Sequence, residues 1–435
     1  MIFAILLPTA QAEPLSGKVQ MHPTVQAAKH AYCAARYGVN VQRAGYLPSV
    51  GLKLSANDKP VNETTRGDEF GGENSPEYDG EGVDAELSLT QPIYDWGKTK
   101  SDVGIAKARR MKEQLVYTAT YDQNSLQLLS ALLLHRSQDA GVKALQKNVR
   151  RLQGNRKAVG TQVRLGYTAK RALNDYDLLL LDRESMLAEA ELQKRETGRL
   201  LVSEYDISTQ EVPALATRLA AKLPRAMTAV TPAESLVVRQ MDEDIRIFDL
   251  QAKRIRAQGL PKIEARMGAR NWDVTQSDLC TDIAPDKTDC RTYDVTGSLE
   301  FSMPLYTGGA QSNQKRALLS KKSEMQARRS ILLTQNEQEN INAKQRLDVL
   351  SNRLLAAEEK VGLLTSQLEI ERKRQKTNAI RFNVIAELDS ALADAKLSAT
   401  SLAYEIQMAH ARQLARNGRL AQTLELNGEL PSCRM

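Results

Sequence analysis

The chain has 435 residues, 60 lysines and arginines against 53 aspartates and glutamates, a formal net charge of +7 and 5% aromatic residues. Because the two signs of charge are interspersed and no basic tract carries interleaved aromatics, the pattern argues against a nucleic-acid-binding protein. The length predicts roughly two to four domains, and the low aromatic content favours long helices packed through Leu, Ala and Val.

The first residues form an apolar run, MIFAILLPTAQA, that ends in the small-x-small pattern Ala10-Gln11-Ala12. This ending is typical of a secretory cleavage site, although a basic n-region is missing. We therefore interpret residues 1–12 as the remnant of a signal peptide, the alternative being a frayed apolar terminus. The mature chain would then begin at Glu13 rather than at a cysteine, so no lipid attachment is expected there.

Export makes the four cysteines candidates for disulfide bonds. Cys280 and Cys290 bracket a short polar loop and are the expected pair. Cys33 and Cys433 lie near opposite ends of the chain, and the sequence leaves open whether they pair or stay as free thiols.

Four segments alternate apolar and polar residues with a period of two and predict strands over 48–57, 82–92, 261–271 and 292–303. About ten tilted residues cross a bilayer, and apolar-out, polar-in alternation is typical of a membrane barrel. The alternative is a soluble antiparallel sheet with one solvated face. Residues 58–81 are expected to form an acidic loop, without the regular spacing of a calcium site.

Two proline-free stretches follow the strand pairs, from Pro92 to Pro213 and from Pro304 to Pro431. As one helix, residues 98–165 would span about 100 Å, which is typical of coiled coils rather than globular helices. Each stretch is interrupted near its middle, at Gly166 and at Asn378, where we expect a long helix to reverse. Shorter helices are expected over 22–45 and 233–258, and an irregular connector over 203–232.

The chain contains an internal duplication. QPIYDWG at 91–97 is matched by MPLYTGG at 303–309, so that Pro92 and Gly97 correspond to Pro304 and Gly309 at two strand-to-helix turns. The repeat divides the chain into residues 13–212, a connector at 213–232, residues 233–425 and a tail at 426–435. Because lipid does not tolerate open sheet edges and four strands cannot close a barrel, the chain is expected to oligomerise, three copies giving twelve strands.

These features together resemble the TolC family of outer-membrane efflux and secretion channels. HPTVQAA at 22–28, GYLP at 45–48, GLP at 259–261, the paired motifs and the two interruptions carry the resemblance. It implies an α+β membrane protein: a homotrimer with a 12-stranded outer-membrane β-barrel, four strands per chain, continued by a periplasmic α-helical coiled-coil tunnel with the connector as an equatorial region. The implied partners are outer-membrane lipid, a periplasmic adaptor and an inner-membrane pump, with no enzymatic activity and no cofactor.

The resemblance also implies site residues at the two helix reversals, called the tips below. The pore or gate candidates are Asp175, Asp177, Asn383, Glu387 and Asp389. The expected adaptor contacts are Arg164, Leu165, Gly166, Tyr167 and Thr168 at the first tip, and Asn378, Ala379, Ile380 and Arg381 at the second. The alternatives are a solvated tip and residues that only make the turn.

Within this family we expect the exit duct of a type I secretion system that passes a large protein, such as an adhesin, from an ABC exporter. The RFNVIAELD tip and the missing lipid-anchor cysteine favour this over a multidrug efflux channel working with a proton-driven pump. A periplasmic coiled-coil adaptor is a rival of another class, but the four strands argue against it, and against a cytosolic coiled-coil scaffold. The four histidines show no ligand spacing and no catalytic motif occurs, so neither a metal site nor catalysis is predicted.

Overall fold

A computed structural model describes residues 15–61, 78–167, 169–224, 231–275, 289–376, 382–426 and 432–433. The expected signal remnant, 1–12, lies outside these ranges. The chain divides into two compact units. Unit 1 holds residues up to Cys33, Lys112–Asp242 and Ala327 onward, and unit 2 holds Ala34–Met111 and Glu243–Gln326. Each unit therefore takes segments from both sequence repeats.

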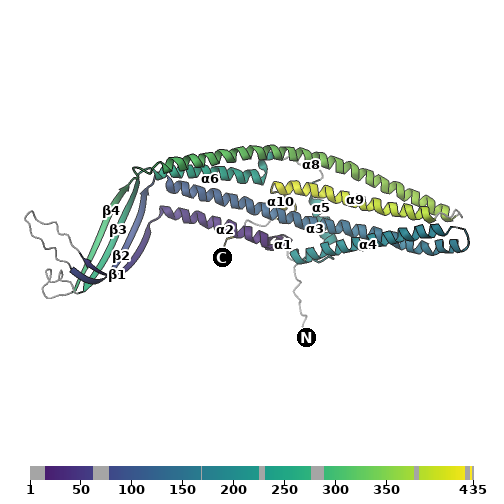
Figure 1. The fold of residues 1–435 in the computed structure, drawn as a ribbon, viewed down its shortest axis with the longest axis horizontal. Coiled ribbons are helices and arrows are strands. Elements are labelled where there is room, and N and C mark those ends of the chain that lie inside the picture. The colour runs from purple at the N-terminus through teal and green to yellow at the C-terminus, as the bar shows by residue number, and fades with distance from the viewer. Residues whose placement is uncertain are drawn as a thin grey trace, which may run out of the picture. The chain divides into compact units, whose positions relative to one another are not determined.

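The sheet of unit 2 has four antiparallel strands in the order β1-β2-β3-β4, which lie side by side in Figure 1. They are β1 (Ser49–Val61), β2 (Tyr78–Tyr94), β3 (Lys262–Thr275) and β4 (Asp289–Ser302). The loop expected over 58–81 is shorter than expected, because β1 continues to Val61 and β2 begins at Tyr78. The ladder holds these ends together, pairing Asp58 with Glu81 and Val61 with Tyr78, so polar composition alone does not end the strands.

The strand-to-helix boundary also differs from the expectation at one point. Pro92 does not end β2, which runs to Tyr94 with a register shift between Pro92 and Tyr94 against β3. Proline cannot donate to the ladder, so an irregularity at this position relieves the missing hydrogen bond. In the second repeat β4 ends at Ser302, before Pro304.

Parts of four helices and one 3-10 turn complete unit 2. They are the second half of α2 (Pro23–Arg43), the 3-10 turn η1 (Ala44–Tyr46), most of α6 (Leu236–Gln258), and the starts of α3 (Lys98–Arg164) and α8 (Ala310–Lys376). Ile105 and Ala108 of α3 pack against Ile247 of α6, with Leu250 beside them. A Cβ at Gly104 would lie 3.1 Å from a methyl of Leu250, so this glycine allows the two helices to approach closely.

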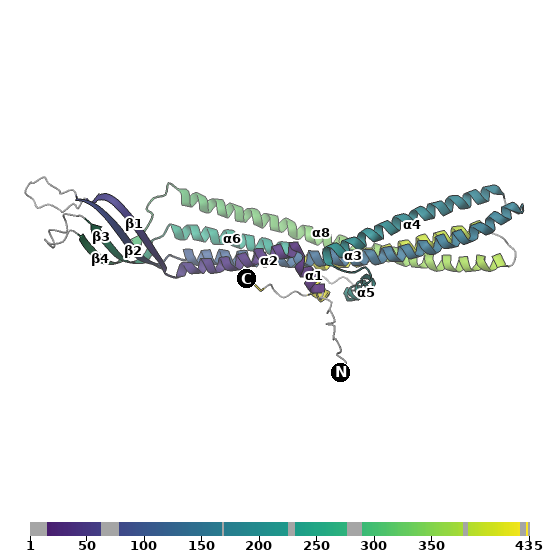
Figure 2. The same cartoon turned by 90° about the horizontal axis from the view of Figure 1, so that it is seen from below.

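Unit 1 is built from two helix hairpins, α3 with α4 (Lys170–Tyr205) and α8 with α9 (Phe382–Arg416) (Figure 2). The α3–α4 hairpin packs Leu152 against Tyr176, whose hydroxyl donates to the Leu152 carbonyl oxygen at 3.1 Å. The α8–α9 hairpin packs Leu368 against Ile385 and Leu392. The long helices after each strand pair are confirmed: α3 and α8 each have 67 residues.

The main core of unit 1 gathers both ends of the chain around the middle of α3. Helix α1 (Leu15–Met21), α5 (Val212–Lys222) and α10 (Leu420–Thr423) all contribute to it. The expectation of an irregular connector was wrong in part, because α5 forms inside it. Val212, Ala216 and Leu219 recur at helical spacing and are buried, so the packed face outweighs the flanking prolines.

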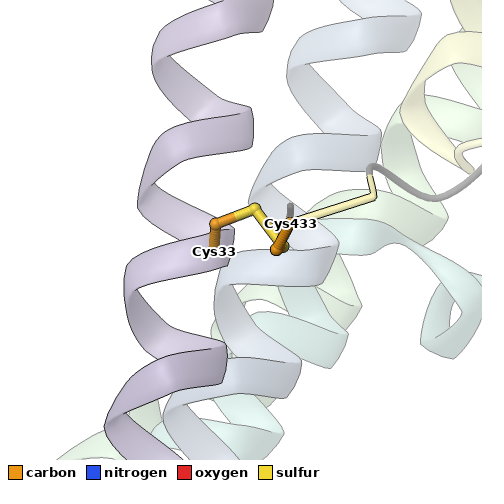
Figure 3. Close-up of a disulfide and its surroundings, with 2 residues drawn as sticks. All are labelled: Cys33 and Cys433. Carbon is orange, nitrogen blue, oxygen red and sulfur yellow. A yellow bond between two sulfur atoms is a disulfide. The ribbon is translucent and has the colours of Figure 1, made fainter. Parts of the chain in front are cut away.

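A disulfide joins Cys33 of α2 to Cys433 near the C-terminus (Figure 3). The expected Cys280–Cys290 pair stays a prediction, because Cys280 lies outside the described residues and the side chain of Cys290 is not described. None of the described helices holds a stretch apolar and long enough to cross a membrane.

Candidate functional site

One face of the sheet is apolar and open in the protomer. Leu87 of β2 is 49% exposed and Leu299 of β4 is 73% exposed. The exposed fractions of seven further large apolar residues of this face fall between these values: Val50, Leu52, Leu54, Met267, Tyr293, Val295 and Phe301. The register aligns the face across all strands, with Leu52 opposite Leu87, Leu87 opposite Ala269 and Ala269 opposite Val295. A row of large apolar side chains is unfavourable in water. This face is therefore expected to contact an apolar environment.

The opposite face of the sheet carries charges in complementary rows. The register places Lys53 opposite Glu86 and Glu86 opposite Arg270, so the signs alternate from β1 to β3. Opposite charges on facing strands stabilise pairing and fix the register, because a one-residue slip would move each charge to the apolar face. The sheet therefore separates an apolar side from a charged side.

The turn from β2 into α3 is organised by Asp95, which the sequence analysis missed. Its carboxylate accepts hydrogen bonds from the backbone N–H groups of Gly97 at 3.0 Å and Thr99 at 2.6 Å. Burial raises the pKa of Asp95, but these hydrogen bonds outweigh it and hold the pKa below the usual value. An aspartate just before a helix is an N-cap signal that could have revealed it.

Glycines at both turns from strand to helix adopt positive φ angles. Gly97 has a φ of +85° and Gly309 a φ of +77°, values that side chains disfavour. The two turns thus use matching glycines, while Thr307 stands where the first turn has Asp95.

Helix α8 carries two apolar stripes within unit 1. Leu347, Leu350 and Leu368 are buried in the protomer. A second set of large apolar residues is between 46% and 64% exposed: Ile331, Ile341, Val349, Leu355, Leu363 and Ile370. At 3.6 residues per turn the exposed set lies within about a third of the helix circumference, on the side opposite the buried leucines. We call this set the outer stripe of α8.

The first tip is a helix C-cap closed by glycine. The N–H of Tyr167 donates to the Gln162 carbonyl oxygen at 2.9 Å and that of Gly166 to Val163 at 3.1 Å, with Gly166 at a φ of +76°. This pairing is the Schellman arrangement. Leu165 and Tyr167 are exposed there, at 64% and 76%. Thr168 and the second-tip residues Asn378, Ala379, Ile380 and Arg381 lie outside the described residues.

The gate candidates occupy different environments. Asp389 is buried within the protomer, where it contacts Arg151 of α3 and accepts from Arg372 of α8 at 3.4 Å. It therefore joins three helices and has no open face of its own. Asp177 pairs with Arg156 at 2.6 Å on the α3–α4 hairpin. Glu387 is exposed and Asn383 half-buried on α9.

Asp175, the remaining candidate, is 60% exposed and lies 3.9 Å from Arg171 in the same helix. The structure thus brings Asp389 together with two arginines but does not bring the candidate carboxylates together. Among the described residues no group of three or more His, Cys, Asp or Glu side chains has a geometry that could hold a metal ion.

Comparisons with known proteins agree with this arrangement. Residues 18–202 match the sequence profile of a family described as outer membrane efflux protein. The solved structure of the outer membrane protein VceC from Vibrio cholerae superposes with a TM-score of 0.71, covering 94% of this chain and 95% of that chain at 14% identity.

The first repeat thus matches the outer membrane efflux protein family, and the fold of the whole chain is that of a solved outer membrane protein. The CmeC outer membrane channel of Campylobacter jejuni gives a TM-score of 0.73 at 12% identity, covering 93% of this chain and 85% of that one. The outer membrane efflux protein BepC of Brucella suis is 29% identical over 109 residues, which cover 25% of this chain and about a fifth of BepC.

The family match gives the two sheet faces a meaning. The protein is an outer-membrane protein with the TolC-like fold, four strands and long helices in each chain, and the matched family is not one of enzymes. The exposed apolar face of the sheet is the face suited to lipid, and the charged face is the one suited to water.

Proposed function

We propose that this outer membrane efflux protein is the exit duct of a three-part export system and works as a homotrimer. The observation that carries the proposal is the sheet, which has an open apolar face, a charged face and, in the protomer, edge strands β1 and β4 that each pair on one side only. Open edges inside a bilayer leave backbone groups unpaired at a cost of several kcal/mol each. Three copies pairing β1 with β4 supply twelve strands and no edge.

The outer stripe of α8 supports the same assembly. A helix that is apolar on two opposite sides fits a wall in which it has a neighbour on each side. One neighbour is α9 of the same protomer, through Leu368. The other is a helix of the next protomer, so the helices would close a tunnel as the strands close a barrel.

Within this duct function, we propose type I protein secretion, with an ABC exporter and a periplasmic adaptor as partners and a large protein such as an adhesin as cargo. The support is the second tip, RFNVIAELD, which resembles that of channels exporting large adhesins. Multidrug efflux is the second candidate, favoured by BepC, which is named an efflux protein.

Affinity capture from detergent-solubilised envelopes, followed by mass spectrometry, tests the assignment. Recovery of an adaptor with an ABC exporter supports secretion, and recovery of a proton-driven pump assigns the duct to drug efflux. Tyr167→Ser, which removes an exposed tip side chain, should reduce adaptor recovery. Lys147→Ala is the matched control, exposed on α3 about five turns before the tip. Equal recovery with both variants would refute adaptor contact at the first tip.

A further inference from the structure

A cavity of about 640 Å³ that is open to solvent lies within unit 1, between α3, the last turns of α4 and the segment that leads into α5. Its lining includes His135, Arg195, Gly198, Arg199, Val202 and Thr209. Neither the sheet nor the tips take part in it, so the duct function does not account for it.

His135 is a buried side chain at this cavity, and one of its ring nitrogens lacks a hydrogen-bond partner in the described part of the chain. The residue is 4% exposed, and this nitrogen is Nδ1. An orphaned buried N–H is costlier than an orphaned acceptor, so the neutral ring that costs least carries its proton on Nε2. In that tautomer Nε2 is a hydrogen-bond donor, which a bound ligand could accept from.

Gly198 keeps the space beside this nitrogen open. A Cβ at position 198 would lie 3.6 Å from His135 Nε2 and 3.0 Å from the Thr209 methyl carbon. Glycine inside a helix costs about 1 kcal/mol relative to alanine, so a reason in packing or binding is expected for it here. At this position the missing side chain leaves the histidine accessible from the cavity.

The charges around the cavity are mostly positive. Lys194, Arg195 and Arg199 line it together with a single carboxylate, Asp139. That carboxylate is already paired, with Lys194 Nζ at 2.6 Å and Lys143 Nζ at 2.7 Å. Burial raises the pKa of Asp139, but the two lysines outweigh this and hold it below the usual value. The carboxylate is therefore occupied, and the arginines supply the remaining charge.

The surroundings of His135 favour the neutral form of its ring. Burial and the charge of Lys194 lower its pKa, and Asp139 raises it by less. The cavity is thus lined by a neutral donor on His135, by cationic donors on Arg195 and Arg199, and by an apolar surface from Val202 and Pro213. Donors without matching acceptors are complementary to an oxyanion, and the apolar surface is complementary to a hydrocarbon group.

We propose that this cavity binds a small organic anion with one carboxylate and a compact apolar body. The carboxylate accepts from His135 Nε2 and from the guanidinium groups of Arg195 and Arg199, and the apolar body packs on Val202 and Pro213. The site is separate from the duct, so its failure leaves the proposed export function untouched.

Equilibrium dialysis of radiolabelled benzoate against the full-length protein in lipid nanodiscs tests this proposal. We expect one saturable site per chain, displaced by unlabelled benzoate but not by neutral benzamide or by inorganic phosphate. Arg199→Gln and His135→Phe should each weaken binding by about tenfold or more, since each removes a hydrogen bond to a charged group. Arg218→Gln, an exposed arginine of α5 that does not line the cavity, is the matched control and should bind like the parent.

Gly198→Ala gives a second arm that leaves every charge in place. Its methyl group fills the space next to His135 Nε2, so affinity should fall while the circular dichroism spectrum stays unchanged. No saturable binding, equal binding of benzamide, displacement by phosphate as strong as by benzoate, or equal affinity of the Arg199→Gln and Arg218→Gln variants would overturn the proposal.

Discussion

Helices α3 and α8 have the same length and occupy equivalent places in the two repeats, yet they are buried differently in unit 1. Between residues 112 and 164, α3 buries a dense series of large side chains, including Leu128, Leu129, Leu132 and Leu152. In α8 the large side chains buried after residue 327 are Leu347, Leu350 and Leu368. The large apolar side chains of α3 are therefore covered within the protomer, whereas those of α8 are covered on one side of the helix only.

The difference arises because the C-terminal segment packs on α3. The carboxylate of Asp122 on α3 accepts from the backbone N–H groups of Leu420 and Ala421, each at 3.0 Å, and Tyr121 donates to the Leu426 carbonyl oxygen at 2.5 Å. At the corresponding positions α8 has Leu333 and Thr334. The two helices have equal length, but only α3 carries the side chains that bind the C-terminal segment, and α8 keeps an exposed apolar stripe.

Truncating a leucine in each helix should separate the two roles most strongly. Leu132→Ala, at a fully buried position of α3, should lower the free energy of unfolding by about 2–5 kcal/mol. Leu355→Ala, 64% exposed on the outer stripe of α8, should change the stability of the dissociated protomer by less than about 0.5 kcal/mol but shift trimer towards monomer.

Denaturant unfolding and native mass spectrometry measure the two effects. Glu358→Ala on α8, an exposed polar position outside the arc of the outer stripe, is the control that should affect neither. If Leu355→Ala left the oligomer intact at every protein concentration and destabilised the protomer as much as Leu132→Ala, the two-role comparison would be wrong.

Removing the disulfide should weaken the packing of the C-terminal segment on α3. Cys33→Ser releases the C-terminal residues that reach α2, and loss of a native disulfide typically costs about 2–5 kcal/mol. We expect a lower unfolding midpoint and faster proteolysis near residues 420–433. Dithiothreitol should reproduce the effect in the parent protein and have little effect on the variant. A parent protein whose midpoint is insensitive to the reductant contradicts the role given to this bond.

The cap on α10 should make stability depend on pH. Burial raises the pKa of Asp122 to about 6, although the hydrogen bonds from Ala421 and Leu420 lower it. A folded pKa above the unfolded value means that the native state holds the proton more tightly. The contribution of Asp122 is therefore full below about pH 4 and is lost as the pH rises through 6, a change of up to about 3 kcal/mol.

Comparison of the parent with Asp122→Asn at pH 4 and pH 7.5 isolates this effect. The variant does not titrate at position 122, so the parent should lose more stability than the variant between the two pH values. Equal losses would show that the carboxylate does not titrate differently in the folded state.

Replacing the arginines that face Asp389 should have the smallest effect on stability, and the cost should differ between the arginine of α3 and that of α8. Arg151 of α3 is 31% exposed and Arg372 of α8 is 38% exposed, with the longer contact of 3.4 Å. Because both arginines are partly solvated, we expect Arg151→Met to cost about 1–2 kcal/mol and Arg372→Met less than that. Unfolding midpoints measure the order, and a larger cost at Arg372 would reverse it.

Much of the fold could be predicted because it depends on hydrophobic periodicity and on the positions of glycine and proline. The alternation around Leu52 and Leu87, the glycines of the two strand-to-helix turns and the long proline-free stretches are local signals, and each was matched by an element. Pro92 and the connector misled the prediction, because ladder pairing and the buried face of α5 outweighed local preference.

Contacts across long separations could not be predicted from the sequence. Asp122, which the sequence did not single out, caps a helix far along the chain, and Asp389, expected at a gate, pairs with arginines on two other helices. No spacing in the sequence indicates such pairs, since they depend on how the helices pack. His135 was dismissed for lack of ligand spacing, whereas its burial beside Gly198 appears only in the fold.

In the proposed barrel the apolar face of the sheet contacts lipid and the charged face does not. The most direct test places a single tryptophan at Leu54 or at its neighbour Ser55, which point to opposite faces of β1, after replacement of Trp96 and Trp272 by phenylalanine. The protein is then reconstituted in vesicles with and without brominated lipid, which quenches tryptophan fluorescence on contact. The account predicts strong quenching at position 54 and little at position 55, and equal quenching at both, or stronger quenching at position 55, would contradict it.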